Sequence, residues 1–406
     1  MTNVYSAFCL GSEFYEGETK MLQTHPIAPH IVRTDVTHTG IGKPRRAVGD
    51  PVAALKQMTR FIPVPQPAPS NLAVPLSVLD PAASEAAQKA GKIVFHCVGD
   101  TGGIHGTATQ EAIATAMEEQ ITTAADDAKP AFFYHLGDVI YFNGQSTLYK
   151  SEFYEPYQYY PAPIFAIPGN HDGDTHTQKG DAPDTEPSLF GFLQNFCAQQ
   201  PEYVSPYRMS ITQPYVYWTL DAPFVTIIGL YSNVEGSLDA RGRMDQQKYL
   251  ETQMTAAPKD KKLLITVHHP PFSLDSAHGG TPDILNAIDR AIVASKRVPD
   301  AVLSGHVHNY QRFSRKIEGK KVPYLVAGAG GYANDARSLH QIQKQLKKVH
   351  LPYKTTHHDV LFEKFEEIQS GYLRITIDQN TAKFEYFRVP FDGSEPETGP
   401  FDSVTA

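Results

Sequence analysis

Five short apolar segments of the sequence each end at side chains that can bind a metal ion. These side chains are carboxylates, an amide and imidazoles: Asp100 after "KIVFHCVG", Asp138 after "AFFYHLG", Asn170 and His171 after "PIFAIPG", His268 and His269 after "KLLITV", and His306 and His308 after "DAVLSG". Short apolar runs are typical of buried strands, and ligands of α/β proteins bind beyond the carboxyl ends of such strands. We therefore expect the five endings to form one site.

The donor set indicates a pair of metal ions. Carboxylate and amide oxygens together with imidazole suit Zn, Mn or Fe better than metals that prefer thiolates, and these groups outnumber what one tetrahedral ion needs. Two ions about 3.5–4 Å apart, clamping the attacking and leaving oxygens of a displacement, would use them all. A carboxylate is the natural bridge because its charge serves both cations. The alternative, a structural zinc cluster, would favour cysteine, but Cys9, Cys97 and Cys197 are too few and too scattered for one.

The surrounding sequence predicts an α/β domain. From residue 91, apolar runs alternate with helix-like segments such as 109–128, which predicts sheets covered by helices. Residues 371–390 predict two antiparallel strands around "DQNTA". Segments 338–351 and 359–368 match amphipathic helices with charged faces, whereas "AGAGGY" (327–332) predicts a tight turn after a strand rather than a dinucleotide loop.

The first 90 residues differ in composition from the rest of the chain. They are rich in proline and turn residues and have little periodicity, so we predict an N-terminal extension over 1–90, of unassigned role, wrapped over a main domain at 91–406.

Charge and hydropathy exclude several classes of function. The chain has 406 residues and a formal net charge of −8, so it offers no basic field for nucleic acid or anionic lipid. No stretch approaches the roughly 18 apolar residues of a membrane span. The N-terminus lacks a basic start followed by an apolar core, which predicts no secretory signal and, by default, a cytoplasmic location. The oligomeric state is not predicted.

Five motifs resemble those of calcineurin-like metallophosphoesterases. They are, in order over roughly residues 92–335, "GDTGG", "GDVIY", "GNHD", "HHP" and "GHVH". Within that superfamily the chain looks most like the purple acid phosphatases, because Gly102 stands where many relatives have histidine and Tyr141 stands three residues after Asp138. The resemblance implies a four-layer αββα sandwich of two mixed β-sheets flanked by helices.

The resemblance also implies a role for each matching residue. The first metal, Fe(3+) in the family, would be held by Asp100, Tyr141 and His308, with the phenolate giving the colour. The second metal, Fe(2+), Zn(2+) or Mn(2+), would be held by Asn170, His268 and His306, and Asp138 would bridge the two ions. His268 is chosen over His269 because the family's ligand precedes the proline by two positions, which leaves His269 as a supporting or packing residue.

The activity implied is hydrolysis of a small-molecule phosphate ester, most simply a phosphomonoester, by metal-bound hydroxide attacking phosphorus in line. His171 would contact the phosphate and assist the leaving group, with Asn170 beside it, and His278 would be a second substrate-contacting histidine. His105 is a weaker candidate for substrate contact. The alternatives are a Mn/Zn-dependent phosphodiesterase acting on nucleotides or lipid headgroups and, more remotely, a non-catalytic scaffold. Because every ligand position is filled, the sequence favours an enzyme.

Overall fold

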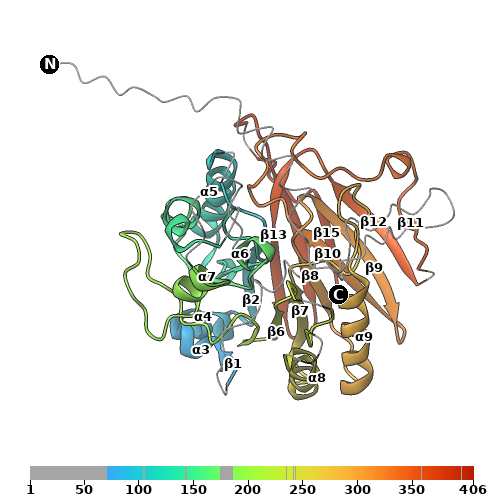
Figure 1. The fold of residues 1–406 in the computed structure, drawn as a ribbon, viewed down its shortest axis with the longest axis horizontal. Coiled ribbons are helices and arrows are strands. Elements are labelled where there is room, and N and C mark those ends of the chain that lie inside the picture. Colours follow the sequence, from blue (N-terminus) through green and yellow to red (C-terminus); the bar gives the residue numbers. More distant parts are fainter. Residues whose placement is uncertain are drawn as a thin grey trace.

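The protein is represented by a computed structural model that describes residues 71–103, 106–141, 144–173, 186–234, 236–240, 242, 244–357, 359–394 and 396–406. Two β-sheets pack face to face, and helices cover both outer faces (Figure 1). The four-layer αββα sandwich implied by the family resemblance is therefore confirmed.

The larger sheet has nine strands in the spatial order β1-β5-β6-β7-β8-β10-β9-β12-β11. Their bounds are β1 (Ala73–Pro75), β5 (Trp218–Ala222), β6 (Val225–Leu230), β7 (Lys262–Val267), β8 (Ala301–Ser304), β9 (Tyr310–Ile317), β10 (Lys320–Ala327), β11 (Tyr353–Lys354) and β12 (Val360–Glu366). The central strands β6, β7, β8 and β10 run parallel, whereas β9 pairs antiparallel with both β10 and β12. The sheet is therefore mixed.

The smaller sheet has six strands in the order β15-β14-β13-β2-β3-β4. Their bounds are β2 (Lys92–Val98), β3 (Phe133–His135), β4 (Ile164–Ala166), β13 (Ser370–Asp378), β14 (Ala382–Val389) and β15 (Asp402–Thr405). Strands β2, β3 and β4 are parallel, and β13, β14 and β15 pair antiparallel. The parallel strands bring their carboxyl ends to one edge, which positions the residues that follow them.

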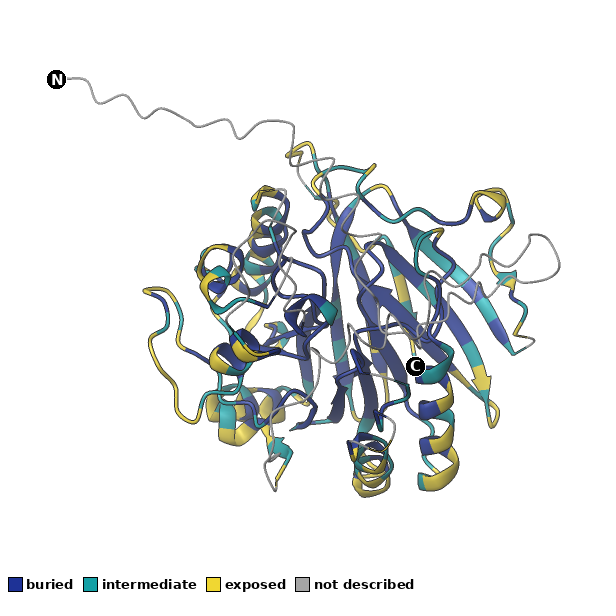
Figure 2. Ribbon diagram, in the orientation of Figure 1, coloured by how far each residue is buried: buried dark blue, intermediate teal, exposed yellow. Residues whose placement is uncertain are grey.

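Helices pack around the two sheets, most of them on the outer faces. They are α3 (Leu76–Leu79), α4 (Pro81–Ala90), α5 (Ala108–Thr123), α6 (Asn170–Gly173), α7 (Phe190–Phe196), α8 (Gln246–Ala256) and α9 (Pro282–Ser295), with short 3-10 turns at Asp126–Ala128, Ser146–Leu148 and Lys344–Leu346 and a π-turn at Lys150–Tyr154. Figure 2 shows the central strands almost wholly buried, whereas the outer face of α9 is exposed. Within the described residues, no helix has both the length and the hydropathy to cross a membrane.

The strands are apolar on both faces because both faces are covered. In β2, Phe95 and Cys97 belong to the buried cluster between the sheets, together with Trp218 of β5. Val98 of the same strand joins Ile113 of α5 in the outer cluster. Because neighbouring side chains of a strand point to opposite faces, a strand buried on both faces has a continuous apolar sequence rather than an alternating one. This explains the uninterrupted apolar runs in the sequence.

Most of the predicted elements are confirmed. The five apolar runs form β2, β3, β4, β7 and β8, the helix predicted over 109–128 is α5, and the C-terminal pair is β13 and β14. The turn predicted at 327–332 follows β10.

Both predicted helices between residues 338 and 368 are wrong. Residues 360–366 form β12, in which Val360 and Phe362 are buried while Leu361 lies between them at the partly exposed face. Pairing of this strand with β9 and β11 outweighs its helix-like spacing of apolar residues. Residues 338–351 form a single β-bridge at Ile342 and a 3-10 turn at Lys344–Leu346, and are otherwise irregular chain.

The described chain joins the sandwich earlier than the predicted start at residue 91. Strand β1 pairs in parallel with β5 at the edge of the larger sheet. Leu76 of α3 and Ala87 of α4 are buried in the cluster between the sheets. Residues 73–90 therefore form part of the domain, and the remainder of the predicted extension, 1–70, lies outside the described residues.

Candidate metal centre

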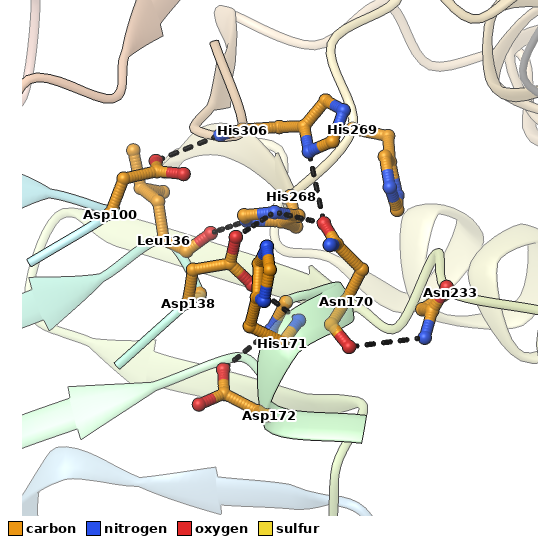
Figure 3. A network of polar contacts seen from close by, with 12 residues as sticks. Asp100, Leu136, Asp138, Asn170, His171, Asp172, Asn233, His268, His269 and His306 are labelled. Atoms are coloured by element: carbon orange, nitrogen blue, oxygen red, sulfur yellow. Dashed lines mark hydrogen bonds and ion pairs between the residues drawn. The ribbon is translucent and has the colours of Figure 1, made fainter. Parts of the chain in front are cut away.

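The residues after the five strands meet at one edge of the sandwich. Figure 3 shows Asp100, Asp138, Asn170, His268 and His306 directed toward one another. Tyr141 and His308 complete the group: the Tyr141 hydroxyl lies 3.1 Å from Asp138 Oδ2 and 3.2 Å from His308 Nε2. The structure therefore brings together all seven residues predicted as metal ligands.

The chain turns sharply where three of these residues follow their strands. Asp100, Asp138 and His306 have φ values of 61°, 52° and 67°, in the left-handed region. This conformation costs a non-glycine residue roughly 1–2 kcal/mol, and such strain is typical of functional sites. The turns also need neighbours without side chains: a Cβ atom at Gly305 would lie 2.6 Å from Asp100 Oδ2, and one at Gly169 would collide with the Asp138 carboxylate.

The first of two ligand sets consists of three oxygens and one nitrogen. The Tyr141 hydroxyl lies 3.3 Å from Asp100 Oδ1, 3.1 Å from Asp138 Oδ2 and 3.2 Å from His308 Nε2. His308 Nε2 in turn lies 3.4 Å from Asp100 Oδ1. All four side chains are at most 4% exposed.

The second ligand set shares Asp138 Oδ2 with the first. His268 Nε2 lies 3.2 Å from this oxygen and 3.1 Å from Asn170 Oδ1. Asn170 Oδ1 also lies 3.0 Å from His306 Nδ1. The two sets therefore meet at a single carboxylate oxygen, the position that a bridging ligand occupies.

The spacing within each set matches the coordination shell of a metal ion. Oxygen and nitrogen ligands lie about 2.0–2.2 Å from Zn²⁺, so adjacent ligand atoms are separated by about 3.0 Å in an octahedral shell and about 3.4 Å in a tetrahedral one. The measured separations within the two sets, 3.0 to 3.4 Å, fall in this interval. The residues present therefore fit two ions.

The hydrogen bonding of His268 also requires a positive charge between the ligands. Its Nδ1 lies 2.9 Å from the Leu136 carbonyl oxygen, which can only accept, so Nδ1 carries a proton. In the neutral ring, Nε2 then presents a lone pair to the oxygens of Asp138 and Asn170, which are also electron-rich. Burial acts to lower the pKa of His268, but the charge and hydrogen bond of Asp138 together with the charge of Asp100 and the Leu136 carbonyl outweigh it and raise that pKa to about 9. Either a proton or a metal ion must occupy this position.

Burial disfavours the anionic forms of the two acids and the phenol at this centre. Burial raises the pKa of Asp100 and that of Tyr141, which disfavours both anions. Burial also acts to raise the pKa of Asp138, but the charges of His268 and His171 hold it well below its usual range. A bound cation would stabilise all three anions together.

Two further buried carboxylates hold the ligand loops in place. Asp172 accepts hydrogen bonds from the backbone N–H groups of Val139 at 3.0 Å and Gly169 at 2.7 Å. Glu152 accepts from the N–H of Tyr141 at 2.8 Å. Burial raises the pKa of each to about 7, and the nearby Asp138 charge adds to the effect at Asp172. Sequence analysis missed both; Asp172 could have been noticed because it lies within "GNHD", whereas nothing marks Glu152.

The histidines predicted outside the ligand sets lie around the centre. The His171 backbone N–H donates to Asp138 Oδ1 at 2.9 Å, and its ring centroid lies 4.4 Å from that of Tyr141. His269 packs 4.4 Å from the His306 ring and contacts Ser232 Oγ through Nδ1 at 2.7 Å. One of its ring nitrogens lies within 4.8 Å of ligand atoms of His268 and His306.

His278, the predicted second substrate residue, lies beside His306, with the two ring centroids 4.7 Å apart. His105 lies outside the described residues.

The two sheets contribute different ligand types. The oxygen donors Asp100, Asp138, Tyr141 and Asn170 follow strands β2, β3 and β4 of the smaller sheet. The nitrogen donors His268, His306 and His308 follow β7 and β8 of the larger sheet. The centre therefore forms only where the two sheets are packed together.

The family model of the calcineurin-like phosphoesterases matches residues 93–310, which include every residue of both ligand sets. The chain belongs to this family. The family is that of phosphoesterases and implies a binuclear metal centre, and the described histidines and aspartates include groups that could hold a metal ion.

Curated relatives include purple acid phosphatases. Purple acid phosphatase 22 of Arabidopsis thaliana is 26% identical over 144 residues, which cover 34% of this chain and 32% of that protein. The tartrate-resistant acid phosphatase type 5 of Oryctolagus cuniculus is 25% identical over 260 residues, which cover 61% of this chain and 75% of that protein. The match thus spans about a third of the length of the plant relative.

Solved structures share the fold at low identity. The purple acid phosphatase PPD1 of yellow lupin, Lupinus luteus, has a TM-score of 0.55 and 14% identity, over 77% of this chain and 53% of that one. GAP50 of Plasmodium has a TM-score of 0.52 and 11% identity, over 77% and 88% of the two chains. At these identities the likeness concerns the fold.

Proposed function

We propose that this protein hydrolyses small phosphomonoesters at a binuclear metal centre, as a purple acid phosphatase-like enzyme. The observation that carries the proposal is the pair of ligand sets that share Asp138 Oδ2. Asp100, Tyr141 and His308 would hold a ferric ion, and Asn170, His268 and His306 an Fe(2+), Zn(2+) or Mn(2+) ion. Bound there, the two cations would neutralise the phosphate and lower the pKa of a coordinated water.

The chain's own residues would bind the ester and assist its cleavage. His171 is held against the centre by its N–H bond to Asp138, and only 6% of it is exposed. His278 lies beside His306, with ring centroids 4.7 Å apart. Either imidazole, when protonated, can donate to the departing ester oxygen, a role that typically accelerates a reaction by about 10²–10⁴-fold. No covalent phosphoenzyme is needed, so we assign no serine or cysteine nucleophile.

Charge balance supports a monoester rather than a diester. Asp100, Asp138 and a phenolate from Tyr141 would bring three negative charges to a ferric and a divalent ion. Before a coordinated water loses its proton, the loaded centre would then carry a surplus of about two positive charges in a buried setting, where electrostatic interactions are strong. A phosphomonoester at neutral pH is a dianion and matches this surplus, whereas a phosphodiester carries a single charge.

The test compares the wild type with Asp138→Asn, which keeps the shape of the bridge and removes its charge. Asp260→Asn, an exposed acid between α8 and β7, is the matched control. We expect about two metal ions per wild-type chain and turnover of p-nitrophenyl phosphate faster than of bis(p-nitrophenyl) phosphate. Substitution of residues that only support metal ligands already lowers metal affinity or activity by about 10–100-fold. Asp138→Asn should therefore lower turnover by at least that factor, whereas Asp260→Asn should leave turnover unchanged.

Two results would contradict this proposal and favour another function. Faster turnover of the diester, with both metals bound, would favour the phosphodiesterase acting on nucleotides or lipid headgroups. Absence of bound metal and of turnover after reconstitution with Fe, Zn and Mn would favour a non-catalytic scaffold, a role suggested for one structural neighbour by its description as an anchor.

A further inference from the structure

A segment without any recognised motif lies against the metal centre. Residues 338–343, called the strap here, follow β10 and run beside the ligand loop after β8. The His340 backbone N–H donates to the His308 carbonyl oxygen at 3.0 Å, and the Asn309 side-chain amide donates to the His340 carbonyl at 2.6 Å. The strap is therefore attached to the loop that carries a predicted ligand.

The other side of the strap pairs with the loop that carries His278. The Ser276 N–H donates to the Gln341 carbonyl at 2.8 Å, and Asp275 and Ile342 form an antiparallel β-bridge. Asp275 organises this loop, because its carboxylate accepts from the N–H groups of residues 277, 278 and 279 at 2.7 to 2.8 Å. The strap thus fills the space between two loops of the site.

The ring of His340 lies directly on the ring of His308. The two rings are almost parallel, at an interplanar angle of 10°, and their centroids are 4.2 Å apart. The His308 backbone N–H also donates to His340 Nδ1 at 3.0 Å. His340 therefore contacts His308 through both its ring face and its ring nitrogen.

The ring of His308 packs against the rings of His340 and Tyr332, with centroids 4.2 Å and 4.3 Å away. A metal-binding histidine normally donates its second ring N–H to a carboxylate, a carbonyl or water, which fixes the ring. His308 Nε2 faces the centre, but its Nδ1 has no hydrogen-bond partner among the described residues. Packed rings therefore take the place of the usual hydrogen-bonded support. The ring of His340 is stacked parallel to His308 and hydrogen-bonded to its backbone, whereas the ring of Tyr332 is tilted by 48°.

The same contacts argue against a third metal ion at the strap, although ligand atoms of Asp275, His278 and His340 lie within 4.8 Å of one another. A backbone N–H can only donate, so His340 Nδ1 carries the lone pair and Nε2 the proton. A protonated Nε2 cannot coordinate a cation. The Asp275 oxygens are already occupied by backbone N–H groups and by the Ser273 hydroxyl at 2.7 Å.

We propose that His340 is a positioning residue for the metal ligand His308, and that the strap exists to hold His340 against it. The inference rests on the proposed function in that it takes His308 as a ligand of the first ion. His340 touches neither the ion nor the substrate. It acts by holding the His308 ring in the one orientation that directs Nε2 toward Asp100 and Tyr141.

Three substitutions separate the two contacts of His340. His340→Phe keeps the stacked ring and loses the acceptor, His340→Asn keeps an acceptor at the Nδ1 position and loses the ring, and His340→Ala loses both. His350→Ala, an exposed histidine farther along the same stretch of irregular chain, is the matched control. Each protein is stripped of metal, checked for folding by thermal melting, and titrated with Fe(3+) and Zn(2+) against a chelator.

We expect His340→Ala to weaken binding of the first ion by about 10–100-fold while the second ion binds as in the wild type. The affinity of His340→Phe for the first ion should be closer to the wild-type value than that of His340→Asn, because the stacked ring sets the orientation of His308. Unchanged affinity of the first ion in His340→Ala would overturn the inference and leave the proposed function intact. Three ions in the wild type and two in His340→Ala would overturn it in favour of a strap metal site. A wild type that binds no metal would instead refute the proposed function.

Discussion

The substitution Tyr141→Phe tests the predicted first ligand set with the smallest possible change. It removes one oxygen atom, which lies 3.1 to 3.3 Å from the nearest carboxylate oxygens of Asp138 and Asp100 and from Nε2 of His308. The ring itself can stay in place, because it packs 4.4 Å from the rings of both His171 and Tyr332. The substitution therefore leaves no ring-sized cavity, and its effect reports on the hydroxyl alone.

Two magnitudes follow from these contacts. In the metal-free protein the hydroxyl donates to a carboxylate, and hydrogen bonds to charged groups contribute about 1.5–3 kcal/mol, so the free energy of unfolding should fall by that amount. In the loaded protein the first ion loses one ligand of its set. We expect its affinity to fall by at least about 100-fold, or 2.7 kcal/mol. The second ion should bind unchanged, because its set contains no atom of Tyr141.

The assay combines urea unfolding of the metal-free protein, metal content after reconstitution, and the visible spectrum. Wild-type protein loaded with iron should be purple, and the variant should lose the band because no phenolate remains. Tyr332→Phe is the matched control: it removes the same hydroxyl from a ring 4.4 Å away. If Tyr141→Phe keeps both ions at wild-type affinity, Tyr141 is a packing residue and the first ligand set is wrong. Two ions without colour in the wild type would point to a Mn- or Zn-dependent centre.

Two other perturbations probe the fold around the centre. His96 is buried between Tyr160 and Gln120, and burial lowers its pKa to about 3 from the 6.5 of the unfolded chain. The stability that neutral His96 contributes is therefore complete above pH 6.5 and is lost as the pH falls toward 3, because in this range only the unfolded chain takes up the proton. Between pH 8 and pH 5, the free energy of unfolding in urea should fall by about 2 kcal/mol more for the wild type than for His96→Gln. Gly169→Ala should reduce metal content and lower the free energy of unfolding by about 1–3 kcal/mol, because the new methyl group collides with Asp138. Metal content equal to that of the wild type would show that the Asp138 carboxylate can be displaced without loss of metal.

The residues of the candidate site could be predicted to lie together because their signal in the sequence is local. Each buried strand is an apolar run of a few residues, and Asp100, Asp138 and His268 follow their runs within three residues. Parallel strands then bring those positions to one edge without further information. The prediction therefore needed only the positions of the strands, not their pairing.

The parts that were missed depend on contacts between distant residues. Strand β12 has helix-like spacing, and it becomes a strand by pairing with β9, some 50 residues earlier. His340 has no motif, and its position follows from hydrogen bonds to His308 and to the loop around Ser276. β1 likewise joins the sheet through β5, more than 140 residues away. No local pattern specifies such pairings.

The division of ligands between the sheets links the stability of the fold to the chemistry of the site. Oxygen donors come from the smaller sheet and nitrogen donors from the larger, so each proposed ion would be held by both sheets. The sheets already meet through polar contacts near this edge: the Tyr134 hydroxyl of β3 lies 3.1 Å from Thr266 Oγ1 of β7, and His306 N–H donates to Asp100 Oδ2 at 2.8 Å. A small slide of one sheet over the other would separate imidazoles from carboxylates in both sets at once. Metal affinity should therefore respond to substitutions in the apolar layer between the sheets, and bound metal should in turn resist separation of the sheets.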